Sequence, residues 1–66
     1  MECFVPGYWI NARGQVLPVS SIPNDYLQNI IRFLQRWYAE EEDMLVRIAI
    51  RNKIDELEDE LICRDN

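Results

Sequence analysis

The stretch PNDYLQNIIRFLQRWY, residues 23–38, decides the fold of this chain. Pro23 suits a first helical turn, where its missing N–H is not needed, and Asp25 carries a charge that the positive end of a helix dipole favours. The apolar side chains recur every three or four residues and so fall on one stripe of a helix: Leu27, Ile30, Ile31, Leu34, Trp37 and Tyr38. The stretch therefore predicts an amphipathic helix over residues 24–38.

Upstream of this helix, residues 4–19 predict a β-hairpin. Two short runs rich in β-branched and aromatic residues, 8–10 and 16–19, flank a polar loop. Within the loop, Gly14 can adopt the positive φ that a short hairpin connection often requires. Pro18 cannot donate to a strand ladder, so the second strand is expected to lie at an edge or to end there. Two strands alone are marginally stable in water, and the hairpin is therefore expected to pack on a helix.

Downstream, residues 42–63 carry a second helical pattern. Its apolar stripe again recurs every three or four residues: Val46, Ile50, Ile54, Leu57 and Leu61. Further apolar residues, Met44, Leu45, Ile48 and Ala49, make the start of this helix apolar nearly all round, so we expect that start to be buried. The acidic residues 40–43 favour a break between the two helices, because a single helix of about 60 Å would leave its far end unburied. One long helix is the alternative, in an oligomer.

Length and composition place these elements in one α+β domain, with the N-terminal β-hairpin packed on two helices. A chain of 66 residues with 48% hydrophobic residues is long enough for one domain and too apolar to remain disordered. No stretch approaches the ~20 apolar residues of a membrane-spanning helix, and residues 1–6 lack the features of a signal peptide. A cytoplasmic protein is expected. Cys3 and Cys63 are then expected to be free thiols, a disulfide between them being the alternative.

The residue types leave little catalytic equipment. The chain has no histidine, which is the commonest general base and metal ligand. Two cysteines alone do not make a zinc site, and two glycines do not make a phosphate-binding loop. We therefore predict a protein that is not an enzyme and that holds no cofactor or metal.

The distribution of charge indicates the kind of partner. The net charge is −5, and residues 40–66 alone contain ten acids and four bases. This half suits a host protein with a basic surface, or simply keeps a small protein soluble. The predicted contact residues are three acids on the second helix and two aromatic anchors on the first, Glu56, Asp59, Glu60, Trp37 and Tyr38. The alternative for the three acids is that they form a solvated helix face. The alternative for the two aromatic residues is that they fill the core.

Two other functions remain open from the residues alone. In a homo-oligomeric structural or assembly module, the second helix would pair with itself in a homodimer through a seam of Ile50, Ile54, Leu57 and Leu61. A small nucleic-acid-binding regulator would use Arg13, Arg32 and Arg36. Nucleic acid is not the expected partner, because phosphate-backbone binding needs a concentrated basic surface.

Residues 9–34 carry a pattern that can be written W…G…PVS.I….L.N.IR.L. It consists of Trp9, Gly14, Pro18-Val19-Ser20, Ile22, Leu27, Asn29, Ile31-Arg32 and Leu34. The pattern resembles a family of small, uncharacterised proteins found in phages and prophages of bacteria, and it covers roughly 26 of the 66 residues. The chain departs from the family at Pro23, where many relatives have a capping Ser or Thr, and at Tyr26, where many have a histidine. This chain therefore lacks any metal-binding or acid–base role that the histidine has in those relatives.

The resemblance implies a fold and a genomic context, without an activity. Combined with the size, the acidic half and the lack of catalytic residues, it leads to one hypothesis. The chain is expected to be a phage or mobile-element accessory protein in the cytoplasm of a bacterial host, where it binds a host protein. An inhibitor of a defence system, such as an anti-CRISPR protein, is the role that this context suggests.

Overall fold

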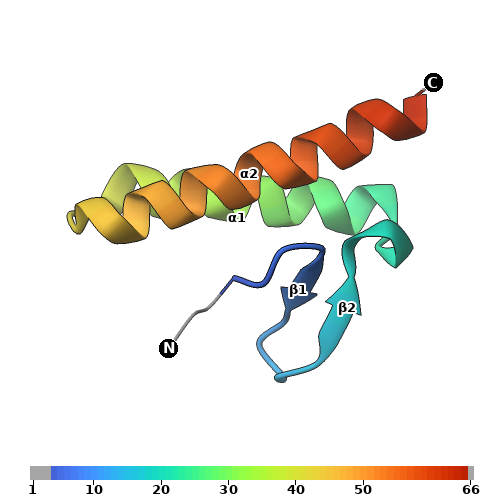
Figure 1. The fold of residues 1–66 in the computed structure, drawn as a ribbon, viewed down its shortest axis with the longest axis horizontal. Coiled ribbons are helices and arrows are strands. Elements are labelled where there is room, and N and C mark those ends of the chain that lie inside the picture. The colour runs from blue at the N-terminus through green and yellow to red at the C-terminus, as the bar shows by residue number, and fades with distance from the viewer. Residues whose placement is uncertain (1–3, 66) are drawn as a thin grey trace.

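The computed structural model describes residues 4–65 and confirms the predicted α+β class. Strands β1 (Tyr8–Ile10) and β2 (Val16–Pro18) form an antiparallel hairpin, and the 3₁₀ turn η1 (Val19–Ser21) leads into helix α1 (Asn24–Glu40). Helix α2 (Met44–Asp65) runs back alongside α1, and the hairpin lies against one side of this helical pair (Figure 1). Neither helix in the described part of the chain is long and apolar enough to cross a membrane.

The two helices are separate, because residues 41–43 break the helical backbone. Glu41 is extended, with φ −79° and ψ 133°, and its N–H still donates to the carbonyl of Trp37. The carboxylate of Asp43 accepts the N–H of Leu45 at 3.0 Å, which is the bond of a helix N-cap. Acidic side chains thus make this tight turn without glycine or proline. Compared with the predicted ranges, α1 ends two residues later, and α2 begins and ends two residues later.

The hairpin loop is built by one amide side chain. The Oδ1 atom of Asn11 accepts the N–H groups of Arg13 at 2.9 Å and Gln15 at 3.0 Å. Gly14 has φ +80°, as predicted for this loop, and β2 ends at Pro18. The register pairs Trp9 with Leu17, and both side chains pack partly buried against the core.

The core lies between η1, α1 and α2. It consists of Val19, Ile22, Leu27, Ile30, Ile31, Leu34, Ile50, Ile54 and Leu57, all buried. The predicted stripe of α1 therefore faces the predicted stripe of α2, as expected for helices that pack by their apolar faces.

The proposed oligomer seam lies within this core. Ile50, Ile54 and Leu57 are buried inside a single chain, and Leu61 packs partly buried against them. A second copy could not reach these side chains without separating α2 from α1.

The expectation that the start of α2 is buried is wrong for the single chain. The exposed fractions of Met44, Leu45 and Ile48 are 68%, 78% and 51%. The helix is apolar on two sides there, but α1 and the hairpin cover only one of them. The start of α2 thus presents a cluster of large apolar side chains to solvent.

A buried ammonium group joins the hairpin to α2. Lys53 is only 3% exposed, and its Nζ donates to the carbonyls of Val5 at 2.9 Å and Tyr8 at 2.8 Å. It also contacts both carboxylate oxygens of Glu56 at 3.2 Å, and Glu56 in turn accepts the N–H of Gly7 at 3.0 Å. A buried charge is tolerated only when it is paired and hydrogen-bonded, so these partners account for its position.

Two arginines of α2 make similar bonds at its ends. The guanidinium of Arg64 donates to the carbonyls of Ile22 at 2.6 Å and Val19 at 3.0 Å, and so holds η1. That of Arg47 donates to the carbonyls of Tyr38 at 2.7 Å and Glu41 at 3.1 Å, at the end of α1. The carbonyls of Tyr38 and Glu41 lie at the end of α1, where helical carbonyls lack a partner within the helix, and the carbonyl of Val19 accepts from Arg64 in addition to the N–H of Ile22.

We expect Lys53→Met to lower the free energy of unfolding by about 2–4 kcal/mol. Methionine keeps an unbranched side chain but removes the donor, which leaves the carbonyls of Val5 and Tyr8 and the carboxylate of Glu56 without it. Urea denaturation followed by circular dichroism measures the change. The control is Arg51→Met on the exposed side of the same helix, which should change stability by less than about 0.5 kcal/mol. Equal effects of the two substitutions would contradict the anchoring role of Lys53.

Candidate functional site

A groove of about 620 Å³ lies between the segment that precedes β1 and the first half of α2. We call it the α2 groove. Its walls come from three parts of the chain, so it exists only in the folded protein. It is lined by Phe4, Pro6, Trp37, Glu41, Leu45, Val46, Ala49, Asn52, Lys53 and Glu56.

The floor and rim of the α2 groove are mainly apolar. Phe4 packs on Trp37, with ring centroids 5.7 Å apart and planes inclined by 53°. Leu45 stands on the rim as the most exposed large apolar residue of the described chain, and Met44 and Ile48 lie beside it on α2. Apolar surface of this kind, gathered beside a concave site, is typical of binding sites rather than of ordinary protein surface.

The charged groups of the groove are not equivalent. The ammonium of Lys53 and the carboxylate of Glu56 pair with one another. The carboxylate of Glu41 has no cationic partner among the described residues: its Oε1 accepts the indole N–H of Trp37 at 2.8 Å, and its Oε2 accepts the backbone N–H of Asp43 at 3.2 Å. The Glu41 end of the groove, next to exposed Glu42 and Asp43, is therefore negative.

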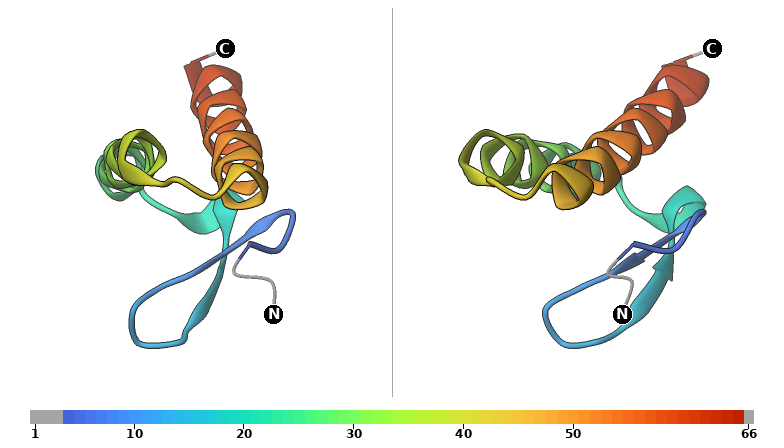
Figure 2. Two further views of the ribbon diagram at one scale, coloured as in Figure 1. Left: turned by 90° about the vertical axis from the view of Figure 1, so that its left-hand side faces the viewer. Right: turned by 60° about the vertical axis from the view of Figure 1, so that its left-hand side comes forward.

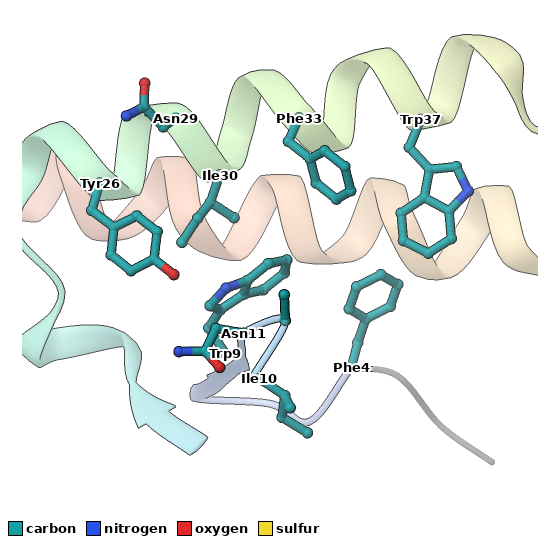
Figure 3. Close-up of a pocket in the computed structure, with 10 residues that line it drawn as sticks. Phe4, Trp9, Ile10, Asn11, Tyr26, Asn29, Ile30, Phe33 and Trp37 are labelled. Carbon is teal, nitrogen blue, oxygen red and sulfur yellow. The ribbon is translucent and has the colours of Figure 1, made fainter. Parts of the chain in front are cut away.

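A second hollow, of about 400 Å³, lies on the other side of Phe4 and Trp37, between the hairpin and α1. Figure 3 shows Tyr26, Phe33 and Trp37 projecting from α1 toward Trp9 and Phe4 on the N-terminal segment. None of its described lining residues is charged. We call it the aromatic cleft. The Phe4–Trp37 pair is the wall that it shares with the α2 groove.

The structure brings two of the five predicted contact residues together. Trp37 and Glu56 line the α2 groove. Tyr38 lies under the guanidinium of Arg47, whose Cζ is 4.1 Å from the ring centroid. Glu60 accepts a bond from Arg64 at 3.0 Å, and Asp59 is exposed. Neither Asp59 nor Glu60 lines the groove. Of the three predicted acids, Glu56 and Glu60 form ion pairs within the chain, and Asp59 is exposed to solvent.

The three arginines considered for nucleic-acid binding are exposed and dispersed. Arg13 lies in the hairpin loop, whereas Arg32 and Arg36 lie on α1. Arg32 shares a shallow hollow with Glu58, and Arg36 shares another with Glu40. Acidic neighbours thus offset the positive charge of both helical arginines, which leaves no concentrated basic surface on α1.

Other candidate chemistry is limited. Within residues 4–65, no group of three or more His, Cys, Asp or Glu side chains is placed to hold a metal ion. Cys63 is exposed on α2, whereas Cys3, its alternative disulfide partner, lies outside the described residues. Comparisons with protein-family models, with curated proteins and with solved structures find no match.

The sequence contained one signal for the α2 groove that was interpreted wrongly. The run Met44-Leu45-Val46 followed by Ile48-Ala49-Ile50 has more apolar residues than one helix face can hold. This excess was expected to be buried, but no segment of residues 4–65 covers the second apolar side of α2, and Met44, Leu45 and Ile48 are exposed. The apolar surplus in the sequence therefore corresponds to apolar side chains that remain exposed at the start of α2.

The indole of Trp37 gives a test of how the groove wall is held. We expect Trp37→Phe to lower the free energy of unfolding by about 1 kcal/mol, because it keeps an aromatic ring against Phe4 but removes the bond to Glu41. Trp9→Phe serves as the control, since the indole N–H of Trp9 donates to no atom of residues 4–65. Thermal unfolding measures both. A larger loss for the control would show that the Glu41 bond does not hold the wall.

Proposed function

We propose that this chain is a non-enzymatic binding module and that the α2 groove holds a segment of a partner protein. The observation that carries the proposal is the position of Leu45, 78% exposed on the rim of an apolar groove. The matching partner segment would place an apolar anchor in the groove and a basic side chain at Glu41.

The energetics of the groove support an apolar anchor. Fully burying a leucine-sized side chain is worth about 1.5–3 kcal/mol, and Leu45 makes little use of this in the free chain. Tryptophan and other aromatic residues in well-packed pockets are enriched among the contacts that dominate binding energy. Trp37 and Phe4 already hold one another in place, so little side-chain entropy would be lost on binding.

The charges support a basic partner. The chain carries a net charge of −5, and the carboxylate of Glu41 forms no ion pair among the described residues, although Arg47 donates to its backbone carbonyl. A carboxylate held by two donors is already oriented and can still accept from an arginine or lysine. Such complementarity speeds association and rejects acidic partners.

The biological role that we propose comes from the sequence resemblance. Residues 9–34 resemble small, uncharacterised proteins of phages and prophages, and on this basis the proposed role is that of an accessory protein of a phage or mobile element in the cytoplasm of a bacterial host. Within that context, a small module with a preformed groove would act by occupying a surface of a host protein. Inhibition of a defence system, in the manner of an anti-CRISPR protein, is the activity that we propose.

Binding through the groove can be tested with three variants. Tagged protein captures candidate partners from a bacterial host, and calorimetry then measures the dissociation constant of each purified partner. We expect Leu45→Glu to weaken binding at least about tenfold, which corresponds to about 1.4 kcal/mol. Glu41→Gln should weaken binding less than Leu45→Glu does, because the amide oxygen can still accept from Trp37. It should also reduce the salt dependence of binding, because it removes the negative charge.

The matched control for these measurements is Val16→Glu, which places the same charge on an exposed apolar residue of the hairpin. It should bind like the unmodified protein. A partner whose affinity is unchanged by Leu45→Glu would show that the groove is not the contact surface.

The inhibitor role has its own test. Phage plating is compared in cells with and without an active CRISPR nuclease, while the protein or its Leu45→Glu variant is expressed. We expect the protein to restore plating only in cells with the nuclease, and the variant to lose this effect. Identical plating with and without the protein, across the defence systems tried, would reject the inhibitor role while leaving the binding measurements intact.

A further inference from the structure

The exposed side of α2 carries a regular row of residues, which borders α1 at Glu58 and Ile62. Met44, Ile48, Arg51, Asp55, Glu58 and Ile62 follow one another at steps of four, three, four, three and four, and all six are exposed. Figure 2, viewed toward the ends of the helices, shows α1 and the hairpin on other sides of α2. We call this row the outer stripe. Its spacing is that of the contact positions of a coiled coil.

The outer stripe is complementary to itself when two copies run antiparallel. With the two-fold axis at the level of residue 53, Met44 faces Ile62 of a second copy, and Arg51 faces Asp55. The same pairs recur on the other side of the axis, as an isologous interface requires. The remaining pair sets Ile48 against the methylene stem of Glu58. Apolar contacts thus lie at both ends, and two ion pairs lie in the middle.

We propose that the outer stripe is a self-association surface through which two copies of this chain form an antiparallel pair. This surface is distinct from the buried row of Ile50, Ile54 and Leu57, and its residues Met44 and Ile48 lie beside the rim of the α2 groove without lining it. Leu45, on the groove rim, lies off the stripe, so a paired molecule can still bind a partner there.

The charges favour this arrangement over its alternatives. A parallel pair would set Arg51 against Arg51 and Asp55 against Asp55, which repel. An antiparallel pair shifted by one heptad would set Met44 against Asp55 and Ile48 against Arg51, and would overlap over fewer positions. Only the arrangement centred at residue 53 uses the whole stripe and pairs opposite charges.

Both central charges are available for such a contact. The Nε of Arg51 lies 3.8 Å from Oδ1 of Asp55 within the same helix, and the two side chains are 64% and 59% exposed. An exposed pair at this distance contributes little to stability and is easily exchanged for another partner. Contacts between copies would therefore replace a weak contact rather than break a strong one.

The size of the stripe sets the strength of the association. From Met44 to Ile62 the helix rises about 27 Å at 1.5 Å per residue. A single helix face of this length buries less than the ~1,200 Å² typical of stable complexes, so the pair is expected to be weak and reversible. Measurements must therefore extend to protein concentrations of about 1 mM, at which an association free energy of only about −4 kcal/mol produces a measurable fraction of dimer.

Exchange of the central charges tests the proposal by sedimentation equilibrium. Arg51→Asp and Asp55→Arg each set like charges against one another in a pair of identical copies, so each variant alone should associate at least about tenfold more weakly than the unmodified chain. In an equimolar mixture, both acids of the first variant face both arginines of the second. The mixture should therefore associate more strongly than either variant alone.

Circular dichroism provides the folding control, because both substitutions lie on the exposed side of α2 and should leave the helix content unchanged. Restored association in the mixture supports the antiparallel pair. An unmodified chain that stays monomeric at the highest concentration would overturn the proposal. So would a dimer that neither substitution weakens, since it must then use another surface.

Discussion

The hairpin is held to the helices by the ammonium group of Lys53, and the arrangement of the candidate surfaces depends on this contact. Two strands of three residues cannot remain folded in water alone. Lys53 binds the carbonyls on either side of the bend at Pro6-Gly7, and Glu56 binds the N–H within it. The segment that carries Phe4 is thereby fixed against Trp37. That pair separates the α2 groove from the aromatic cleft.

The distribution of charge on the surface follows from the same kind of contact. Residues 40–66 contain four bases, and three of them, Arg47, Lys53 and Arg64, donate to carbonyls elsewhere in the chain. Only Arg51 remains in solvent. The acids of α2 therefore dominate its exposed side more strongly than the composition alone suggests, and positive charge at the surface is found mainly on α1 and the hairpin loop. A basic partner would meet α2 first.

Local patterns in the sequence were sufficient to predict the elements of the fold. The stripe from Leu27 to Leu34, the positive φ of Gly14 and the end of β2 at Pro18 each depend on short-range chemistry, and each is observed. Contacts between distant segments were not predictable in this way. Nothing beside Lys53 in the sequence distinguishes it from a solvated lysine, because its carbonyl partners lie 45 and 48 residues away. For the same reason the bond between the carboxylate of Glu56, which was predicted as a partner contact, and the N–H of Gly7 was not predictable from the sequence.

Lys53 and Arg64 on α2 donate to backbone carbonyls, and this limits which substitutions can disturb their hydrogen bonds. A carbonyl oxygen is present at every residue, so Lys53 and Arg64 recognise the path of the backbone rather than the side chains at Val5, Tyr8 or Val19. Substitutions in the hairpin can alter the outward-facing side chains without removing any acceptor of these bonds. The outward-facing side chains of the N-terminal third can therefore be exchanged while two cations on α2, Lys53 and Arg64, keep its backbone in place.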